Sequence, residues 1–148
     1  MAWKWDMTDI IPYLNPTQID SIFEYDKFFK SLEFMDGAYE VLQMLTEKYE
    51  VIIVTMGSLP NLSMKAEWIK QNLPFIHNVI LLYNADGDTD KSMVDMSDGI
   101  FLDDHQNNLW TSNSIEQYVF GEIYEYNQDY KGTRLYTWDD VRRKLMYE

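Results

Sequence analysis

Two adjacent carboxylates, Asp103 and Asp104, end an apolar run that begins at Gly99. Open α/β sheets place ligands and metals where a buried strand ends at its carboxyl edge. Because two neighbouring carboxylates repel each other, a fold tolerates them best beside a cation. Mg²⁺ suits such a pair, since it prefers oxygen ligands and keeps waters and phosphate oxygens in its shell. The alternative interpretation is a strand followed by an ordinary acidic turn.

Two further residues extend this pair into a phosphate and metal site. Thr55 ends the apolar run 51–55, and Lys91 follows an acidic loop after the apolar run 79–83. The carboxyl ends of parallel strands meet at one edge of a sheet, so we expect these groups to converge. The hydroxyl and the ammonium would hold phosphoryl oxygens, while the carboxylates would hold Mg²⁺. Either residue alone is common, so the order along the chain carries the hypothesis.

Strands that alternate with helices must position these side chains. The spacing of apolar residues predicts helices over 37–48, 61–72 and 138–147 and strands over 51–55, 79–83 and 100–102. Continuous apolar strands indicate a mostly parallel sheet covered by helices on both faces, which is an α/β fold. We also expect a loop over 56–60, a short helix over 115–118 and an outer strand over 122–126.

Composition narrows the classes of function. The chain has 148 residues, which suits one domain, and its lack of cysteine excludes disulfides and thiolate metal sites. Neither a membrane-spanning run nor a signal-peptide pattern is seen, so we expect a soluble, cytoplasmic protein without a membrane partner. The net charge of −13 disfavours polymeric nucleic acid as a partner but leaves room for a small phosphorylated ligand. An acidic protein that mimics DNA is a minor alternative.

The order of these features resembles the haloacid dehalogenase-like (HAD-like) phosphohydrolases and, within them, the 5′(3′)-deoxyribonucleotidases. The run 51–55 is similar to the second motif of the superfamily, 90–92 to the third and 99–104 to the fourth. Three further segments are similar to the deoxyribonucleotidase family in particular. Residues 27–42 resemble its Phe-Phe and Pro-Gly-Ala segment, residues 65–69 its Lys-x-x-Trp helix, and residues 134–138 its closing Arg-aromatic-x-x-Trp segment. The resemblance runs from about Trp5 to the C-terminus.

The resemblance implies a HAD-like three-layer sandwich, with 1–34 as a remnant of a small helical cap and 35–148 as the core of a single domain. It also implies Mg²⁺-dependent removal of phosphate from deoxynucleoside monophosphates. Thr55 and Lys91 would be catalytic and would bind phosphate together with Met56, while Asp103 and Asp104 would bind Mg²⁺. Four aromatic residues would line a nucleobase pocket or, alternatively, belong to the core: Trp3, Trp5, Phe28 and Phe29.

The front of the chain departs from the family pattern. The family begins with an apolar strand ending in Asp-x-Asp, whose first Asp attacks phosphorus and whose second acts as general acid and base. At the front of this chain Asp6 and Asp9 are three residues apart, and the segment 5–8 is similar to part of the cap instead. Asp36 replaces the usual Pro, and His105 stands where the family often has Arg.

From this departure we expect a domain that is truncated or split before its nucleophile, with doubtful activity alone. The missing strand would lie between the second-motif and fourth-motif strands, so these would leave a gap, pair directly, or accept a strand from another chain. A homodimer or a separate peptide would supply that strand. The alternative is a catalytically inactive binding or inhibitor protein on the same fold, whose acidic surface contacts a protein partner.

Overall fold

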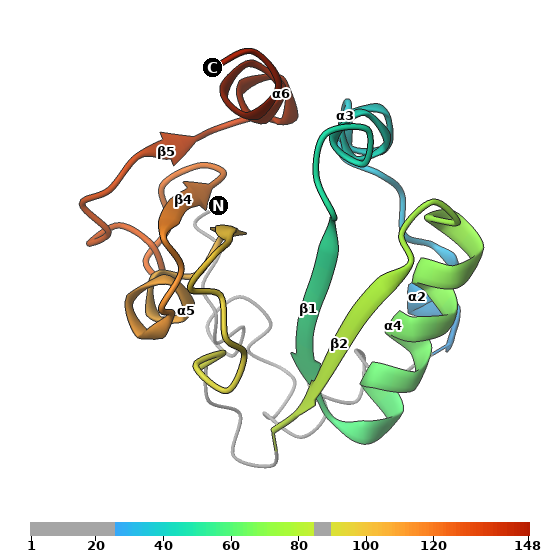
Figure 1. Cartoon of the computed structure of the whole chain (residues 1–148). Coiled ribbons are helices and arrows are strands. Elements are labelled where there is room, and N and C mark those ends of the chain that lie inside the picture. Colours follow the sequence, from blue (N-terminus) through green and yellow to red (C-terminus); the bar gives the residue numbers. More distant parts are fainter. Residues whose placement is uncertain (1–25, 85–89) are drawn as a thin grey trace. The chain divides into compact units, whose positions relative to one another are not determined.

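The structure is a computed structural model that describes residues 26–84 and 90–148 (Figure 1). These residues form two compact units. The first, which we call the β1–β2 unit, comprises 26–84 and 138–148, and the second, the β3–β5 unit, comprises 90–137. The predictions for residues 1–25, including Trp3, Trp5, Asp6 and Asp9, lie outside the described residues. So does the acidic loop 85–89.

A parallel strand pair forms the centre of the β1–β2 unit. β1 (Ile52–Gly57) pairs with β2 (Asn78–Tyr83), and Thr55 lies opposite Leu81. Parallel neighbours need a crossover connection, which α4 (Leu59–Asn72) supplies while packing on both strands (Figure 1). The core of this unit comprises Ile69, Leu73 and Ile76, with Ile53 and Trp68 packed against it. The runs predicted as strands at 51–55 and 79–83 are therefore confirmed.

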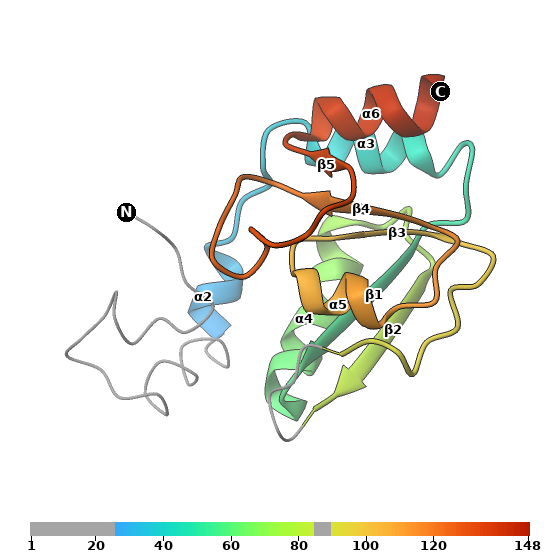
Figure 2. The same ribbon diagram turned by 90° about the vertical axis from the view of Figure 1, so that its left-hand side faces the viewer.

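Three further helices belong to the same unit. α2 (Asp26–Lys30) contacts α4, and α3 (Ala38–Leu45) lies beside α6 (Trp138–Tyr147), as Figure 2 shows. Gly37 precedes α3 with φ of +78°, a conformation that glycine adopts without the steric penalty of a Cβ. Near the end of α6 the carbonyl of Leu145 accepts hydrogen bonds from Lys48 Nζ and Tyr49 Oη at 2.8 and 2.7 Å. These bonds fix the last turn of α6 to the chain that follows α3.

The β3–β5 unit is a three-stranded parallel sheet. Its strands are β3 (Ile100–Asp103), β4 (Glu116–Phe120) and β5 (Arg134–Leu135), in that spatial order. α5 (Gln106–Thr111) lies in the connection between β3 and β4 and packs on both. Phe101 and the fully buried Leu109 and Val119 form the core of the unit. Asp103 is thus the last residue of a strand in a hydrogen-bonded ladder, opposite Val119.

Two predicted elements in this unit are wrong. Residues 115–118 do not form a helix, because β4 begins at Glu116: the N–H groups of Ile115 and Glu116 donate to Gly99 O, and the strand then pairs with β3. Residues 122–126 form turns instead of an outer strand. There the Asn127 side chain accepts from Tyr124 N and donates to Glu122 O, so it occupies backbone groups that a strand would use.

The predicted loop over 56–60 is also wrong, because strand and helix follow each other almost directly. β1 continues to Gly57, Ser58 is the N-cap of α4, and its hydroxyl accepts a hydrogen bond from Asn61 N at 3.3 Å. Pro60 lies in the first turn of α4, where a missing N–H leaves no hydrogen bond unmade. The helix α5 had no counterpart among the expected elements.

The α/β class with parallel strands flanked by helices is confirmed. Among the described strands β1 pairs with β2 alone and β3 with β4 alone, so direct pairing of the second-motif and fourth-motif strands is not observed. The proposed division into cap remnant and core stays a prediction. No helix within the described ranges is both long and apolar enough to cross a lipid bilayer.

Candidate functional site

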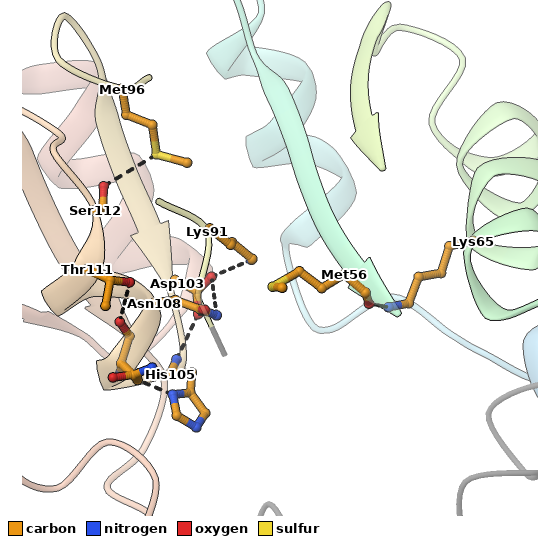
Figure 3. A network of polar contacts seen from close by, with 10 residues as sticks. Met56, Lys65, Lys91, Met96, Asp103, His105, Asn108, Thr111 and Ser112 are labelled. Carbon is orange, nitrogen blue, oxygen red and sulfur yellow. Dashed lines mark hydrogen bonds and ion pairs between the residues drawn. The ribbon is translucent and has the colours of Figure 1, made fainter. Parts of the chain in front are cut away.

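Asp103 is the centre of a dense polar network at the carboxyl end of β3 (Figure 3). Lys91 Nζ lies 2.6 Å from its Oδ2. The N–H of His105 donates to its Oδ1 at 2.8 Å, and Asn108 Nδ2 lies 3.1 and 3.3 Å from the two oxygens. The side chains of Lys91 and Asp103 are only 12% and 7% exposed. The pair is thus a charge-assisted contact shielded from solvent, and the surrounding donors hold the carboxylate in one orientation.

Local sequence explains most of this arrangement. The bond from His105 N to Asp103 spans two residues, as is typical of the turns that aspartate forms with its own backbone. His105 then caps α5, because its Nδ1 accepts from Asn107 N at 3.1 Å. This cap starts α5 so that Asn108 reaches back to Asp103 (Figure 3). Strand end, turn and short helix therefore place Asp103, His105 and Asn108 from nearly consecutive residues, whereas Lys91 comes from a separate segment.

Asp104 has a different environment from its neighbour. Its side chain is exposed, yet the surrounding protein and the adjacent Asp103 carboxylate raise its pKa above the usual range. Lys91 opposes this effect, and solvent screens part of the repulsion. The ionised form of Asp104 is thus disfavoured until a cation approaches. A metal ion at this point would remove the repulsion between the two carboxylates.

The donor set fits Mg²⁺. Asp103 and Asp104 offer hard carboxylate oxygens, and the buried Oδ1 of Asn108 has no hydrogen-bond partner among the described residues. Residues 26–84 and 90–148 contain no group of three or more His, Cys, Asp or Glu side chains that could hold a metal by themselves. The remaining ligands would then be water and substrate oxygens, which Mg²⁺ usually retains.

An aromatic stack borders the acidic pair. The His105 ring lies nearly parallel to that of Tyr126, with centroids 5.7 Å apart, and Tyr126 stacks in turn on Tyr124 at 5.4 Å. Burial lowers the pKa of His105, which favours the neutral ring that its role as an acceptor for Asn107 N requires. Burial, then the charge of Asp104, raises the pKa of Tyr126 to about 12. Both rings are therefore neutral at neutral pH.

Thr55 lies in the β1–β2 unit, two residues before the end of β1. The carbonyl of the next residue, Met56, accepts a hydrogen bond from Lys65 Nζ of α4 at 2.6 Å (Figure 3). A Cβ at Gly57 would lie 2.1 Å from Asn61 Oδ1, so a larger residue at this strand end would require the Asn61 side chain to move. The residues after Thr55 therefore make a tight strand-to-helix turn with a lysine bound to it.

The predicted site residues are thus placed as follows. Lys91, Asp103 and Asp104 come together in the β3–β5 unit, whereas Thr55 and Met56 lie in the other unit. Phe29 is buried in α2, and Phe28 is half-buried with its ring 5.4 Å from that of Phe29, as the core interpretation requires. The roles assigned to these residues stay predictions.

Three residues of the network were missed by the sequence reasoning. Asn108 could have been found, because a short helix directly after Asp104 returns it to Asp103. Asn127 bonds to the backbone of Asp104 and Arg134 bonds to Asn127, but they lie 23 and 30 residues away along the chain. No short-range pattern indicates contacts of that separation.

Comparison with known proteins is consistent with this geometry. The family model described as "5′ nucleotidase, deoxy (Pyrimidine), cytosolic type C protein" matches residues 1–147. Two relatives, the 5′(3′)-deoxyribonucleotidases of Bacillus subtilis (strain 168) and of Bacillus phage SPbeta, are each 30% identical over 127 residues. Each match covers 83% of this chain and 67% of the relative.

Proposed function

The chain belongs to the family of deoxy-pyrimidine 5′ nucleotidases of cytosolic type C, and from this premise we propose that it acts in the dephosphorylation of deoxynucleoside monophosphates. The observation that carries the proposal is the Lys91–Asp103 contact at 2.6 Å beside Asp104, at the carboxyl end of a parallel strand. An ammonium and two carboxylates at such an edge suit a phosphate and its divalent cation.

Each group has a distinct part in this proposal. Asp103 and Asp104 would hold Mg²⁺, which would polarise a phosphoryl oxygen and balance its charge. Lys91 has two ammonium protons beyond the one directed at Asp103, and these would bind phosphoryl oxygens. The hydroxyl of Thr55 and the N–H of Met56 are further proposed donors to phosphate, from the carboxyl end of β1.

A carboxylate nucleophile is the remaining requirement. Covalent phosphoryl transfer of the kind the family uses needs an Asp that attacks phosphorus, and loss of such a nucleophile removes most of the rate. We propose that an apolar strand ending in Asp-x-Asp completes the site. The parallel strands β1 and β3 each have one edge that no other described strand occupies, which supports this proposal.

The test is phosphate release from deoxynucleoside 5′- and 3′-monophosphates with Mg²⁺. One arm uses the chain alone, and another adds a synthetic peptide with an apolar strand ending in Asp-x-Asp. We expect Mg²⁺-dependent release in the peptide arm, its loss in Asp103→Asn, and its retention in Asp98→Asn, where the replaced carboxylate is exposed.

Each outcome of this assay has a consequence. Release by the chain alone would contradict the need for an added strand but support the assigned reaction. Release that survives in Asp103→Asn would contradict the role of the acidic pair. No release in any arm would contradict the proposed function.

A further inference from the structure

We propose that Asn127 and Arg134 form a clamp that positions Asp104 for a divalent cation by holding the backbone of that residue. Neither side chain is assigned as a metal ligand. This inference rests on the proposed function, because it assumes that the acidic pair binds a metal. Both are positioning residues that act through Asp104.

Asn127 is fully buried and uses its entire hydrogen-bonding capacity. Its Nδ2 donates to the carbonyls of Asp104 and Glu122 at 3.1 and 3.2 Å. Its Oδ1 accepts from Tyr124 N at 2.9 Å and from Arg134 Nη2 at 3.2 Å. Since two acceptors face the nitrogen and two donors face the oxygen, only one orientation of the amide satisfies all four contacts. The rigid Asn127 side chain therefore holds the main-chain carbonyl of Asp104.

Arg134 fixes Asn127 in turn. It begins β5, and its Nη1 donates to the carbonyls of Gly121 and Glu122 at 2.9 and 3.1 Å. Its Nη2 donates to the backbone carbonyl of Asn127 at 3.0 Å as well as to the side chain. The planar guanidinium thus joins both ends of the turn segment 121–127. A sheet strand, an arginine and a buried asparagine form a continuous path to Asp104.

The turn segment and Asp129, which follows it, are bound to the chain after Asp104 at three further points. Gln106 N donates to Tyr126 O at 3.1 Å, Asp129 N donates to Gln106 Oε1 at 2.9 Å, and the rings of His105 and Tyr126 stack. Four residues on the two sides therefore contact each other outside the Asn127 amide.

The bond from Asn127 adds a constraint on the Asp104 backbone to the local contacts that the Asp104 side chain makes. Asp103 is held by Lys91, His105 and Asn108, whereas the exposed Asp104 side chain lies next to a like charge. Repulsion from Asp103 would drive the Asp104 backbone away from a geometry in which both carboxylates face one cation. The bond from Asn127 to Asp104 O opposes that movement.

The experiment measures binding of Mn²⁺, a cation that favours oxygen ligands, by electron paramagnetic resonance of the free ion. The variants are Asn127→Ala, Arg134→Lys and the matched control Asn113→Ala. Asn113 also bridges a turn of the same unit, with bonds to Asp95 and Met96, but it has no bond to the acidic pair. All measurements are made at temperatures where circular dichroism shows each variant to be folded.

We expect Asn127→Ala to raise the dissociation constant about 10-fold or more, because partners that orient metal ligands typically change affinity by about 10–100-fold. Arg134→Lys keeps the positive charge but loses the forked guanidinium group, so it should raise the dissociation constant by a smaller factor. This variant also tests the proposal if Asn127→Ala fails to fold. Asn113→Ala should leave the constant unchanged. A purely structural role would lower the unfolding temperature of the clamp variants and leave the constant of the folded protein unaltered.

The two proposals fail in different ways. If the wild type binds Mn²⁺ and both Asn127→Ala and Arg134→Lys bind it with the same affinity, the proposed clamp is overturned and the proposed function stays intact. Equal weakening in Asn113→Ala would also overturn it, because the effect would then not be specific to the path through Asp104. Absence of saturable Mn²⁺ binding by the wild type would overturn the metal site and, with it, both proposals.

Discussion

The residue with the most demanding environment is Asp103, whose carboxylate is almost removed from solvent and faces one ammonium. A buried ion pair gains little over an apolar replacement of both partners, but the loss of one partner leaves a charge without compensation. The Lys91–Asp103 contact is therefore stronger evidence for a functional role than for a contribution to stability. Lys91 also lies 5.7 Å from the centre of the Phe101 ring, which adds a weaker cation–π contact.

Lys91→Met should lower the free energy of unfolding by about 3 kcal/mol, since breaking a buried pair on one side leaves the other charge uncompensated. The matched control is Lys30→Met, which removes the exposed i,i+4 pair with Asp26 at the same 2.6 Å distance. That change should lower the free energy of unfolding far less, because solvent screens an exposed pair. Urea denaturation measures both. Similar losses in the two variants would show that Asp103 is not shielded.

Asp104→Asn should stabilise the metal-free protein at neutral pH, because it removes a carboxylate whose pKa is raised by the surrounding protein and by the adjacent Asp103. The folded protein holds this proton more tightly than the unfolded chain, so wild-type stability falls as pH rises from the ordinary value of 3.8 through the raised pKa. The advantage of the variant is therefore complete above that pKa and vanishes as pH falls to 3.8. Thermal unfolding across this range measures it.

The same variant also tests the cation. Mg²⁺ that binds only the folded state should raise the unfolding temperature of the wild type more than NaCl of equal ionic strength does. Asp104→Asn should lose this excess. If wild type and variant respond to Mg²⁺ identically, the acidic pair does not bind it.

At the scale of elements, short connections determine where the site residues lie. β1 passes into α4 through a single N-cap residue, and β3 passes into α5 through Asp104 and the N-cap His105. In both cases the side chain of the cap accepts an N–H of the first turn, from Asn61 onto Ser58 and from Asn107 onto His105. The strand ends that carry Thr55 and Asp103 are therefore each fixed by the start of a helix.

Ser58→Ala should lower the free energy of unfolding by about 1 kcal/mol, because the N–H of Asn61 loses its acceptor. Ser63→Ala, at an exposed position inside the same helix, is the control and should have little effect, since alanine is the better helix former. Urea denaturation of both variants measures the difference. A loss in Ser63→Ala as large as that in Ser58→Ala would contradict the capping role.

At the scale of the whole molecule the dominant feature is a net charge of −13 on 148 residues. Such a charge repels itself and destabilises the compact state, while it disfavours contact with nucleic-acid backbones. Among the described residues, the ion pairs that could offset this charge are mostly exposed pairs within helices, for example Arg143 with Asp139. Exposed pairs of this kind contribute little, so we expect repulsion to dominate.

Raising NaCl from about 0.01 M to about 0.1 M shortens the Debye length from roughly 30 Å to roughly 10 Å and should therefore raise the unfolding temperature. An uncharged solute at equal osmolarity is the control for general solvent effects. A fall in unfolding temperature with salt would show instead that attractive ion pairs outweigh the net charge. Differential scanning calorimetry provides the measurement.

The pattern of residues along the chain was enough to predict the class of fold, the helices over 61–72 and 138–147, and the strands that carry Thr55 and Asp103. These follow from apolar periodicity, which is a local property. It also indicated the acidic pair and Lys91, because the types and order of these residues are visible in the chain. The short elements after Asp104 were harder to predict, since Gln106–Thr111 and Glu116–Phe120 have no strong apolar periodicity of their own.

Only the tertiary structure decided which groups meet. It showed that Lys91 pairs with Asp103, that residues 116–120 form the strand beside β3, and that Asn127 donates a hydrogen bond to the backbone carbonyl of Asp104. The physical reason is that a strand of five residues gains its stability from neighbours distant in sequence, and a buried asparagine is determined by the donors and acceptors around it. The local conformational preference of residues 115–126 was too weak to specify their structure. The groups that they pair with decided it instead.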